Sequence, residues 1–423
     1  RGSLPAREGF IVGIHPSSTR RRLISRLLAT IGFSAALLAG TALPASASHL
    51  GAPVPSFTFQ DHALVKPSSS GVSPEAIETA DLNRDGNPDT VVGTLAGVQT
   101  LLGNGDGTFQ AAVLHQVPSG AMRSVVTADF DADGHVDIAA SQQVFGQAPK
   151  VTLLSGNGDG TFAPPVNVEV GSAVAGAWAT ASPFTADVNG DGSADLVVGI
   201  ERVGSTVQYE TAVLVGRGDG TFATPRAADT AGGVILRELA DVNGDGRADL
   251  LGTKSGQAAV AHGDGQGGFG TVRTIAAGAD PLDVTAGDLN GDGRVDLVTI
   301  SRHYDVNVLL ATKKGSYSAP TTYRDTLLRA FRGTLVDLNS DGHLDVAVAN
   351  TWNDDFPGTG RVAVFLGSGD GTLQDVRRYL PVVNSPFTFD IAPDDFDGDG
   401  RPDLIVSNNK NLNSVTSLHN TTQ

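Results

Sequence analysis

The sequence predicts an all-β fold in which seven similar units of about fifty residues follow one another. An Asp-rich string of nine residues occurs seven times, and a short apolar run follows each copy. A Gly-Asp-Gly string of the kind that forms hairpins recurs between the copies. An apolar stretch at residues 57–65 resembles a strand that the last unit lacks. Together these features predict a seven-bladed β-propeller.

The Asp-rich string reads Asp-x-Asn/Asp-x-Asp-Gly-x-x-Asp, and its spacing sets the length of a unit. The runs that follow it, such as residues 90–92, 196–198 and 404–406, are rich in β-branched residues, which is typical of short strands. Each copy is therefore expected to be a loop that leads into a strand. The copies begin at Asp81, Asp129, Asp187, Asp241, Asp288, Asp337 and Asp395.

Oxygen ligands at alternate positions, with Gly at position 6 for a sharp turn, are what a hard cation requires. The all-oxygen set favours Ca²⁺ over transition metals, which prefer His or Cys. We expect up to seven structural Ca²⁺ ions, held by the side chains at positions 1, 3, 5 and 9 and the carbonyl at position 7. The predicted ligands are Asp81, Asn83, Asp85, Asn87 and Asp89; Asp129, Asp131, Asp133, His135 and Asp137; Asp187, Asn189, Asp191, Ser193 and Asp195; Asp241, Asn243, Asp245, Arg247 and Asp249; Asp288, Asn290, Asp292, Arg294 and Asp296; Asp337, Asn339, Asp341, His343 and Asp345; and Asp395, Asp397, Asp399, Arg401 and Asp403.

An EF-hand loop begins in the same way but needs Glu at position 12 and a helix on each side. No copy has Glu there, and the first has Val92. The EF-hand is therefore excluded. A single Asx-Gly turn without metal is common, but seven copies with four oxygen side chains at fixed offsets predict cation sites.

The hairpin strings complete the unit. Residues 104–109, 157–162, 217–222 and 368–373 each lie between strand-like runs, so every unit has four short antiparallel strands. The Arg-Gly-Asp sequence at 217–219 lies inside one of these turns and needs no adhesion role. The last unit ends after its third strand, near residues 415–419, and the N-terminal strand is expected to complete it and close the ring.

The paired motifs resemble those of FG-GAP/VCBS repeat proteins, the blade type of the integrin α-subunit head and of several fungal and bacterial lectins. The resemblance covers about residues 55–420. It implies calcium loops between the first and second strands of each blade, on the lower face. It also implies ligands on the upper face, between blades or on accessory domains, and we expect no accessory domain in this chain.

The first 47 residues are expected to be an N-terminal extension and a secretory signal, which leaves residues 48–423 for the propeller. Arg20, Arg21, Arg22 and Arg26 precede an uncharged run at residues 27–43 and a small-residue site that ends at Ala47. Cleavage after Ala47 would give an extracellular protein with no membrane span in the mature chain. Sec export is favoured, and a twin-arginine signal remains an alternative.

The composition agrees with an exported monomer that binds several cations. The formal net charge is -17, with 46 acidic residues and no cysteine. Half of the acidic residues are predicted loop ligands, so the negative charge is expected to serve cation binding. Nucleic-acid binding is excluded because the sequence has no basic stripe, and disulfides are excluded because it has no cysteine.

The sequence favours a non-catalytic binding or adhesion module for a glycan or an extracellular protein. No common catalytic motif occurs, and His135 and His343 are expected to be solvated. Variable loops opposite the calcium loops, such as residues 201–209, are the expected ligand face. An extracellular polysaccharide lyase or another carbohydrate-active enzyme is the alternative. Trp178 is expected in the core, and the candidate ligand residues are Arg302, His303 and Tyr304, together with Trp352, Asn353 and Asp354.

Overall fold

The computed structural model describes residues 53–66, 74–117, 122–228, 233–302, 305–313, 315–324, 329–351, 361–374, 376–379, 387–409 and 414–422. Within these ranges the regular structure is entirely β-strand. The all-β prediction is therefore confirmed. The described part of the chain has no helix that could cross a membrane.

The strands pair in four-stranded antiparallel units that follow chain order, except that the last unit includes the N-terminal strand. The first units are β2 (Pro74–Ala80), β3 (Asp89–Thr94), β4 (Gly97–Leu101) and β5 (Val113–His115); β6 (Val125–Ala128), β7 (Asp137–Phe145), β8 (Lys150–Leu154) and β9 (Val166–Glu169); and β10 (Trp178–Ala186), β11 (Asp195–Val203), β12 (Val207–Leu214) and β13 (Arg226–Ala227). The middle units are β14 (Ile235–Ala240), β15 (Asp249–Lys254), β16 (Gln257–Ala261) and β17 (Arg273–Ile275); and β18 (Pro281–Gly287), β19 (Asp296–Ser301), β20 (Asp305–Leu309) and β23 (Thr321–Arg324), with a small hairpin of β21 (Ala311–Lys313) and β22 (Ser316–Tyr317). The last are β24 (Arg329–Val336), β25 (Asp345–Thr351), β26 (Arg361–Phe365) and β27 (Arg377–Tyr379); and β28 (Phe387–Asp394), β29 (Asp403–Asn409), β30 (Ser414–Asn420) and β1 (Phe57–Ala63).

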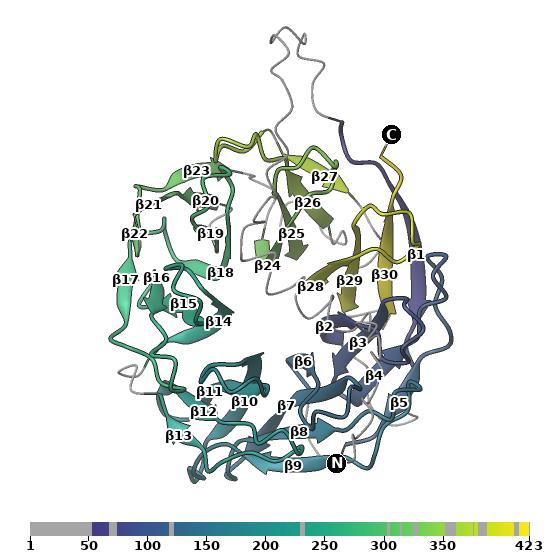
Figure 1. Cartoon of the computed structure of the whole chain (residues 1–423), viewed down its shortest axis with the longest axis vertical. Helices are drawn as coiled ribbons and strands as arrows, with labels where there is room; N and C mark the ends of the chain where they lie inside the picture. Colours follow the sequence, from purple (N-terminus) through teal and green to yellow (C-terminus); the bar gives the residue numbers. More distant parts are fainter. Residues whose placement is uncertain are drawn as a thin grey trace, which may run out of the picture.

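The units lie side by side around a common centre, which gives a propeller-like arrangement (Figure 1). The first strands, such as β14 and β28, lie nearest the centre, and fourth strands such as β5 and β17 lie at the periphery. At two places neighbouring units also pair: β10 pairs with β7, and β28 pairs with β25.

The hydrophobic core lies between neighbouring units. One cluster combines Val91 and Val98 of β3 and β4 with Ile138 and Leu154 of β7 and β8. Neighbouring units cover both faces of the inner strands, which explains why every residue of β3 is buried. Each unit therefore depends on its neighbours for its core, as in other repeat proteins.

The N-terminal strand belongs to the last unit, and that unit contacts the first. Strand β1 pairs with β30 over its full length, from Phe57 opposite Asn420 to Ala63 opposite Ser414. The predicted pairing of the N-terminal strand with the last unit is thus present. The rings of Phe109 and Phe396 lie 5.4 Å apart in an edge-on contact between these two units.

The predicted hairpins are also present. Isolated bridges join the residues on either side of the Gly-Asp-Gly turns: Gly103 with Phe109, Gly156 with Phe162, Gly216 with Phe222, Gly263 with Phe269 and Gly367 with Leu373. In the Arg-Gly-Asp copy, Asp219 accepts a bond from Thr221 N at 3.0 Å, so its carboxylate is held within the turn.

Candidate metal centres

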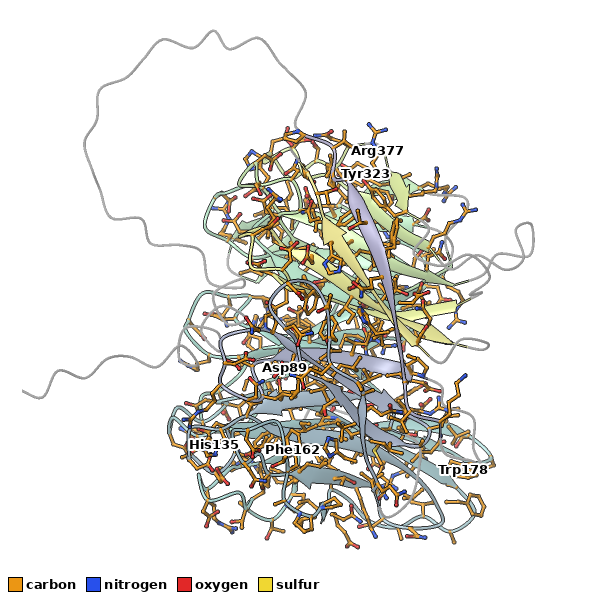
Figure 2. The ribbon with its side chains drawn as sticks, turned by 90° about the vertical axis from the view of Figure 1, so that its right-hand side faces the viewer. Asp89, His135, Phe162, Trp178, Tyr323 and Arg377 are labelled. Atoms are coloured by element: carbon orange, nitrogen blue, oxygen red, sulfur yellow. The ribbon has the colours of Figure 1, made fainter. Side chains whose placement is uncertain are left out.

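Each Asp-rich loop connects the first strand of a unit to the second. Its ninth residue is also the first residue of that second strand, as Asp89 is of β3 and Asp137 is of β7. Asp89 and His135 belong to the loops of the first two units, and His135 lies at the opposite edge of the sheets from Trp178 (Figure 2). One ligand of every loop is therefore fixed on a rigid sheet, and the others lie on a turn at its end.

Backbone N–H groups orient the carboxylates at positions 1 and 5 in all seven loops. The N–H of Gly at position 6 donates to the position-1 carboxylate, as from Gly134 to Asp129 Oδ2 at 2.9 Å. The N–H at position 7 donates to the position-5 carboxylate, as from His135 to Asp133 Oδ1 at 2.8 Å. In the other loops the position-1 carboxylate accepts the same bond at N–O distances of 2.6–3.1 Å. The position-5 carboxylate accepts its bond at N–O distances of 2.8–3.0 Å.

The position-9 aspartates are buried and accept two backbone bonds each. Asp137 is 2% exposed. Its Oδ2 accepts from Phe130 N and its Oδ1 from Gly156 N, both at 2.8 Å. The first bond closes the loop, and the second fastens the loop to the hairpin after the third strand. Asp89, Asp195, Asp249, Asp296, Asp345 and Asp403 make the same pair of bonds.

Sequence reasoning missed this connection because it treated the loop and the hairpin as separate repeats. The signal was the Gly that holds this place in five of the units: Gly103, Gly156, Gly216, Gly263 and Gly367. A Cβ on Gly156 would lie 2.2 Å from the carbonyl oxygen of Val136, and one on Gly103 would lie 2.3 Å from that of Pro88. In these units only a residue without a side chain allows the two backbones to approach so closely.

We expect Gly156→Ala to destabilise the protein by about 1–3 kcal/mol, because the methyl group would displace the backbone of the Asp-rich loop. Chemical denaturation in calcium measures the change. Ala311 holds the equivalent place in the fifth unit, where its N–H donates to Asp296 Oδ1 at 2.7 Å. Ala311→Gly is the control, with an expected cost below about 1 kcal/mol. Equal changes in the free energy of unfolding for the two variants would contradict a close approach between Gly156 and the Asp-rich loop.

Carboxylates converge where position 3 is Asp rather than Asn. Ligand atoms of Asp129, Asp131 and Asp137 lie within 4.8 Å of one another, as do those of Asp395, Asp397 and Asp399. Two oxygens on opposite sides of a Ca²⁺ ion are about 4.6–5.2 Å apart, since each Ca–O distance is about 2.3–2.6 Å. The separations therefore fit one hard cation in each loop.

Burial, reinforced by the charges of neighbouring loop carboxylates, raises the pKa of Asp89 and Asp345 to about 7. The same causes raise the pKa of Asp137 and Asp296 to about 6. The backbone donors oppose these shifts but do not cancel them. A buried carboxylate beside two others is unfavourable when ionised, and a bound cation would remove that penalty.

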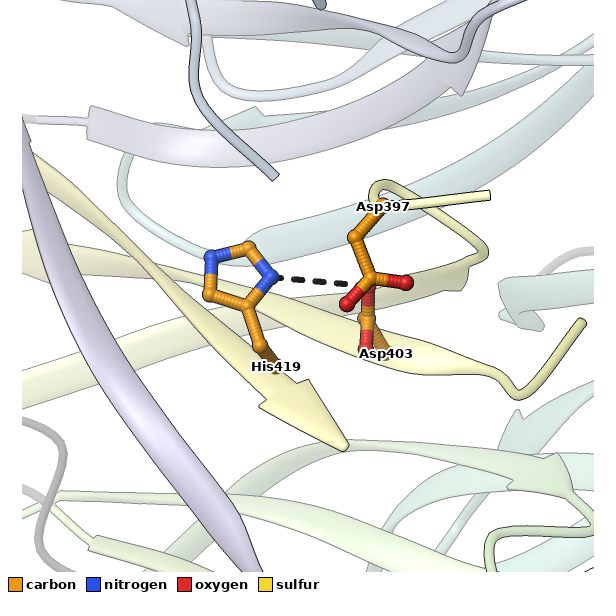
Figure 3. A group of neighbouring side chains, drawn as sticks. All are labelled: Asp397, Asp403 and His419. Carbon is orange, nitrogen blue, oxygen red and sulfur yellow. Dashed lines mark ion pairs between the residues drawn. The ribbon is translucent and has the colours of Figure 1, made fainter. Parts of the chain in front are cut away.

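The loop of the last unit has a histidine beside its carboxylates. His419 Nδ1 lies 3.5 Å from Asp403 Oδ2, and both lie next to Asp397 (Figure 3). The adjacent Asp403 carboxylate raises the pKa of His419, and burial of the ring opposes the shift. His262 holds the same place in the fourth unit, 3.0 Å from Asp249. In the last loop a protonated His419 can balance part of the carboxylate charge.

The side chains at position 7 cover the hairpin of their own unit. The His135 ring is 22% exposed, packs over Gly158 and lies 2.9 Å from Asp133 Oδ2. The prediction of a solvated His135 is therefore wrong, because the hairpin folds back against the loop. His343 remains exposed, with its ring against Gly369. Arg294 and Arg401 pair with the position-5 carboxylates of their loops, Asp292 and Asp399.

Few of the predicted ligand-face residues lie in the described part of the chain. His303, Tyr304, Trp352, Asn353 and Asp354 lie outside the described residues.

Arg302 is described, and its Nε donates to Asp280 Oδ2 at 3.1 Å. The expectation that Trp178 is a core residue is wrong, since its side chain is 48% exposed.

A family model of FG-GAP-like repeats matches residues 81–140, 144–198, 241–299 and 337–406, which make up more than half of the chain. The chain belongs to the FG-GAP-like repeat family. Each matched stretch contains at least one complete Asp-rich loop and the start of the strand that follows it. The resemblance drawn from the motifs is thereby confirmed.

Solved structures share the fold of this FG-GAP-like repeat protein at low identity. An Agrocybe aegerita lectin that recognises non-reducing terminal N-acetylglucosamine is 22% identical, with a TM-score of 0.50, covering 82% of this chain and 86% of the lectin. BBS1N, solved in complex with ARL6DN, is 12% identical, with a TM-score of 0.53, covering 85% of this chain and 96% of BBS1N. No curated protein matches this FG-GAP-like repeat protein in sequence.

Proposed function

We propose that this protein is a secreted, calcium-stabilised binding module for a glycan or an extracellular protein. The observation that carries the proposal is the recurrence of one loop geometry in all seven units. In every copy, backbone donors hold the carboxylates at positions 1, 5 and 9. Such repetition suits a structural cation in each unit better than a single reactive centre.

In this proposal the units are the seven blades of a β-propeller that spans residues 48–423, and β1 closes the ring by completing the last blade. The direct contacts between the first and last units support closure. Gly107 N, for example, donates to Phe396 O at 3.0 Å. A ring without free sheet edges also resists edge-to-edge aggregation.

Secretion places the sites where calcium is plentiful. The signal at residues 1–47 would be cleaved after Ala47. In the absence of cysteine, the cations would provide the cross-links between loop, strand and hairpin that disulfides provide in other secreted domains.

The binding role rests on the fold family and on the separation of the two rims. The Asp-rich loops occupy one end of the strands, which leaves the loops at the other end free to bind. The lectin with the same fold is a binding protein, and this supports a similar role for the chain. A glycan array with and without calcium tests the role, and binding that needs calcium is the expected result.

Calcium titration of the chelated protein tests the metal centres. We expect up to seven bound ions, with weaker binding at pH 5.5 than at pH 8. Asp89, Asp137, Asp296 and Asp345 have a raised pKa in the fold, so protons compete with the ion below about pH 7. Without metal the sign reverses: these groups favour the fold at low pH, and that contribution is lost as pH rises from about 4 to 7. No calcium uptake at pH 8 would contradict the proposal.

A further inference from the structure

An exposed apolar row crosses four neighbouring strands at the rim opposite the Asp-rich loops. Phe145 of β7 lies opposite Trp178 of β10, Trp178 lies opposite Val203 of β11, and Val203 lies opposite Val207 of β12. Directly opposed residues of antiparallel strands point to the same face. The four side chains are 53%, 48%, 42% and 51% exposed, so they form one continuous open surface, which we call the aromatic row.

The aromatic row exists because the strands here are longer than elsewhere. Strands β7, β10 and β11 have nine residues each, whereas β3, β15 and β19 have six. The extra residues extend beyond the core and pair the second unit with the third. Trp178 begins β10, whose other end leads into the loop at Asp187, so the row lies about 27 Å from that loop.

The structure beneath the row is firmly held. On the opposite face, Val144, Ala179 and Arg202 are buried. The Arg202 guanidinium forms two bonds to the Glu210 carboxylate, at 3.0 and 3.2 Å. Above this layer, the rings of Phe145 and Trp178 are 5.1 Å apart and tilted by 56°. Two aromatic faces are thus presented at fixed positions on paired strands.

A row of hydrogen-bonding side chains lies beside the aromatic row on the same face, two residues along each strand. Gln143 lies opposite Thr180, Thr180 opposite Glu201, and Glu201 opposite Tyr209. Tyr209 donates to Glu201 at 3.4 Å, and Gln143 Nε2 donates to Thr180 at 3.4 Å. These groups can accept and donate bonds to hydroxyls at the edge of a ligand that rests on the rings.

We propose that the two rows form a binding site for an uncharged oligosaccharide. Sugar rings would stack on Trp178 and Phe145, and their hydroxyls would bond to Gln143, Glu201 and Tyr209. A sugar ring has an apolar face and a hydroxyl-bearing edge. Such a ligand matches a site that combines aromatic surfaces with a few well-placed polar groups. The inference rests on the proposed binding role and gives that role a site and a ligand class.

Charge and size argue against other occupants. Neither row contains Lys or Arg, and Glu201 faces the site, so anionic lipids and acidic glycans are disfavoured. The aromatic row spans four strands, or about 14 Å. A stable protein interface buries about 800 Å² on each partner, with 20–30 residues, and four side chains fall well short of that.

The test is titration of the calcium-loaded protein with N-acetylchitotetraose, cellotetraose and xylotetraose by calorimetry. We expect at least one to bind, with affinity falling about tenfold or more in Trp178→Ala and Phe145→Ala. Trp178→Phe should keep part of the affinity because it keeps a ring. Phe59→Ala is the matched control, since Phe59 is an exposed aromatic (42%) on β1. Thermal unfolding shows that each variant is folded.

Three results would overturn the site. These are no binding of any of the three sugars below about 10 mM, equal loss of affinity in Phe59→Ala, and unchanged affinity in both row variants. In the last case Arg273→Ala would test the pocket of about 290 Å³ lined by His262, Arg273 and Tyr317 as the true site. Calcium binding by the unmodified protein is measured in a separate titration. Failure of the calcium proposal can therefore be distinguished from failure of the proposed sugar site.

Discussion

Removal of calcium is expected to lower the thermal midpoint of the protein by about 10–20 °C or more. A site at one hundred times its dissociation constant stabilises the folded state by about 2.7 kcal/mol, so two such sites contribute about 5 kcal/mol. In a chain of this size that energy corresponds to about 6–7 °C, so three to seven such sites correspond to about 10–25 °C. The effect arises because an empty loop leaves buried carboxylates, such as Asp89 and Asp345, close to other charges.

Differential scanning calorimetry in calcium and in excess EDTA measures the shift. Adding calcium back should restore the midpoint, and the same ionic strength of sodium chloride should not. A melting curve that is the same in calcium and in chelator would show that the Asp-rich loops are stable without cations.

Asp137→Asn is expected to destabilise the calcium-loaded protein by about 3–5 kcal/mol. Asp137 accepts Phe130 N and Gly156 N with its two oxygens, and an amide can accept only one of them. An unsatisfied buried donor costs about 1–3 kcal/mol, and loss of the ion adds about 2.7 kcal/mol at high saturation. In chelator at pH 8 the cost should be smaller, because burial disfavours the ionised Asp137 whose pKa is raised to about 6.

Asp159→Asn is the matched control for this substitution. Asp159 lies in the hairpin of the same unit, its pKa is lowered by bonds from Thr161, and it is exposed. An Asn side chain can make the same turn, so the expected change is within about 0.5 kcal/mol. Urea unfolding followed by circular dichroism measures both variants. A cost for Asp137→Asn that is equal with and without calcium would remove Asp137 from the ligand set.

Local patterns predicted most of the strands, because the signals for them lie within a few residues. The apolar run after each loop became the second strand of its unit, as in β3 and β29. The Gly-Asp-Gly strings became hairpins. The pairing of β1 with β30 was also predictable, since the last unit lacks a fourth strand in sequence.

The candidate sites were predictable only in part. The side chains at positions 1, 3, 5 and 9 were found from their spacing, because all of them lie within nine consecutive residues. The bond from Gly156 N to Asp137 was missed, since it joins residues 19 apart through the fold of the whole unit. The environment of His135 was misjudged for the same reason.

The sequence by itself determined the repeat, the strand order and the identity of the carboxylates in each loop, because each depends on residues close together in the chain. Only the tertiary structure decided which side chains are buried. Trp178 is apolar and was expected in the core, yet it lies beyond the packed layer because β7, β10 and β11 extend past their neighbours. Exposure depends on which strands come to lie alongside a residue, and in this chain the contacts between units decide that.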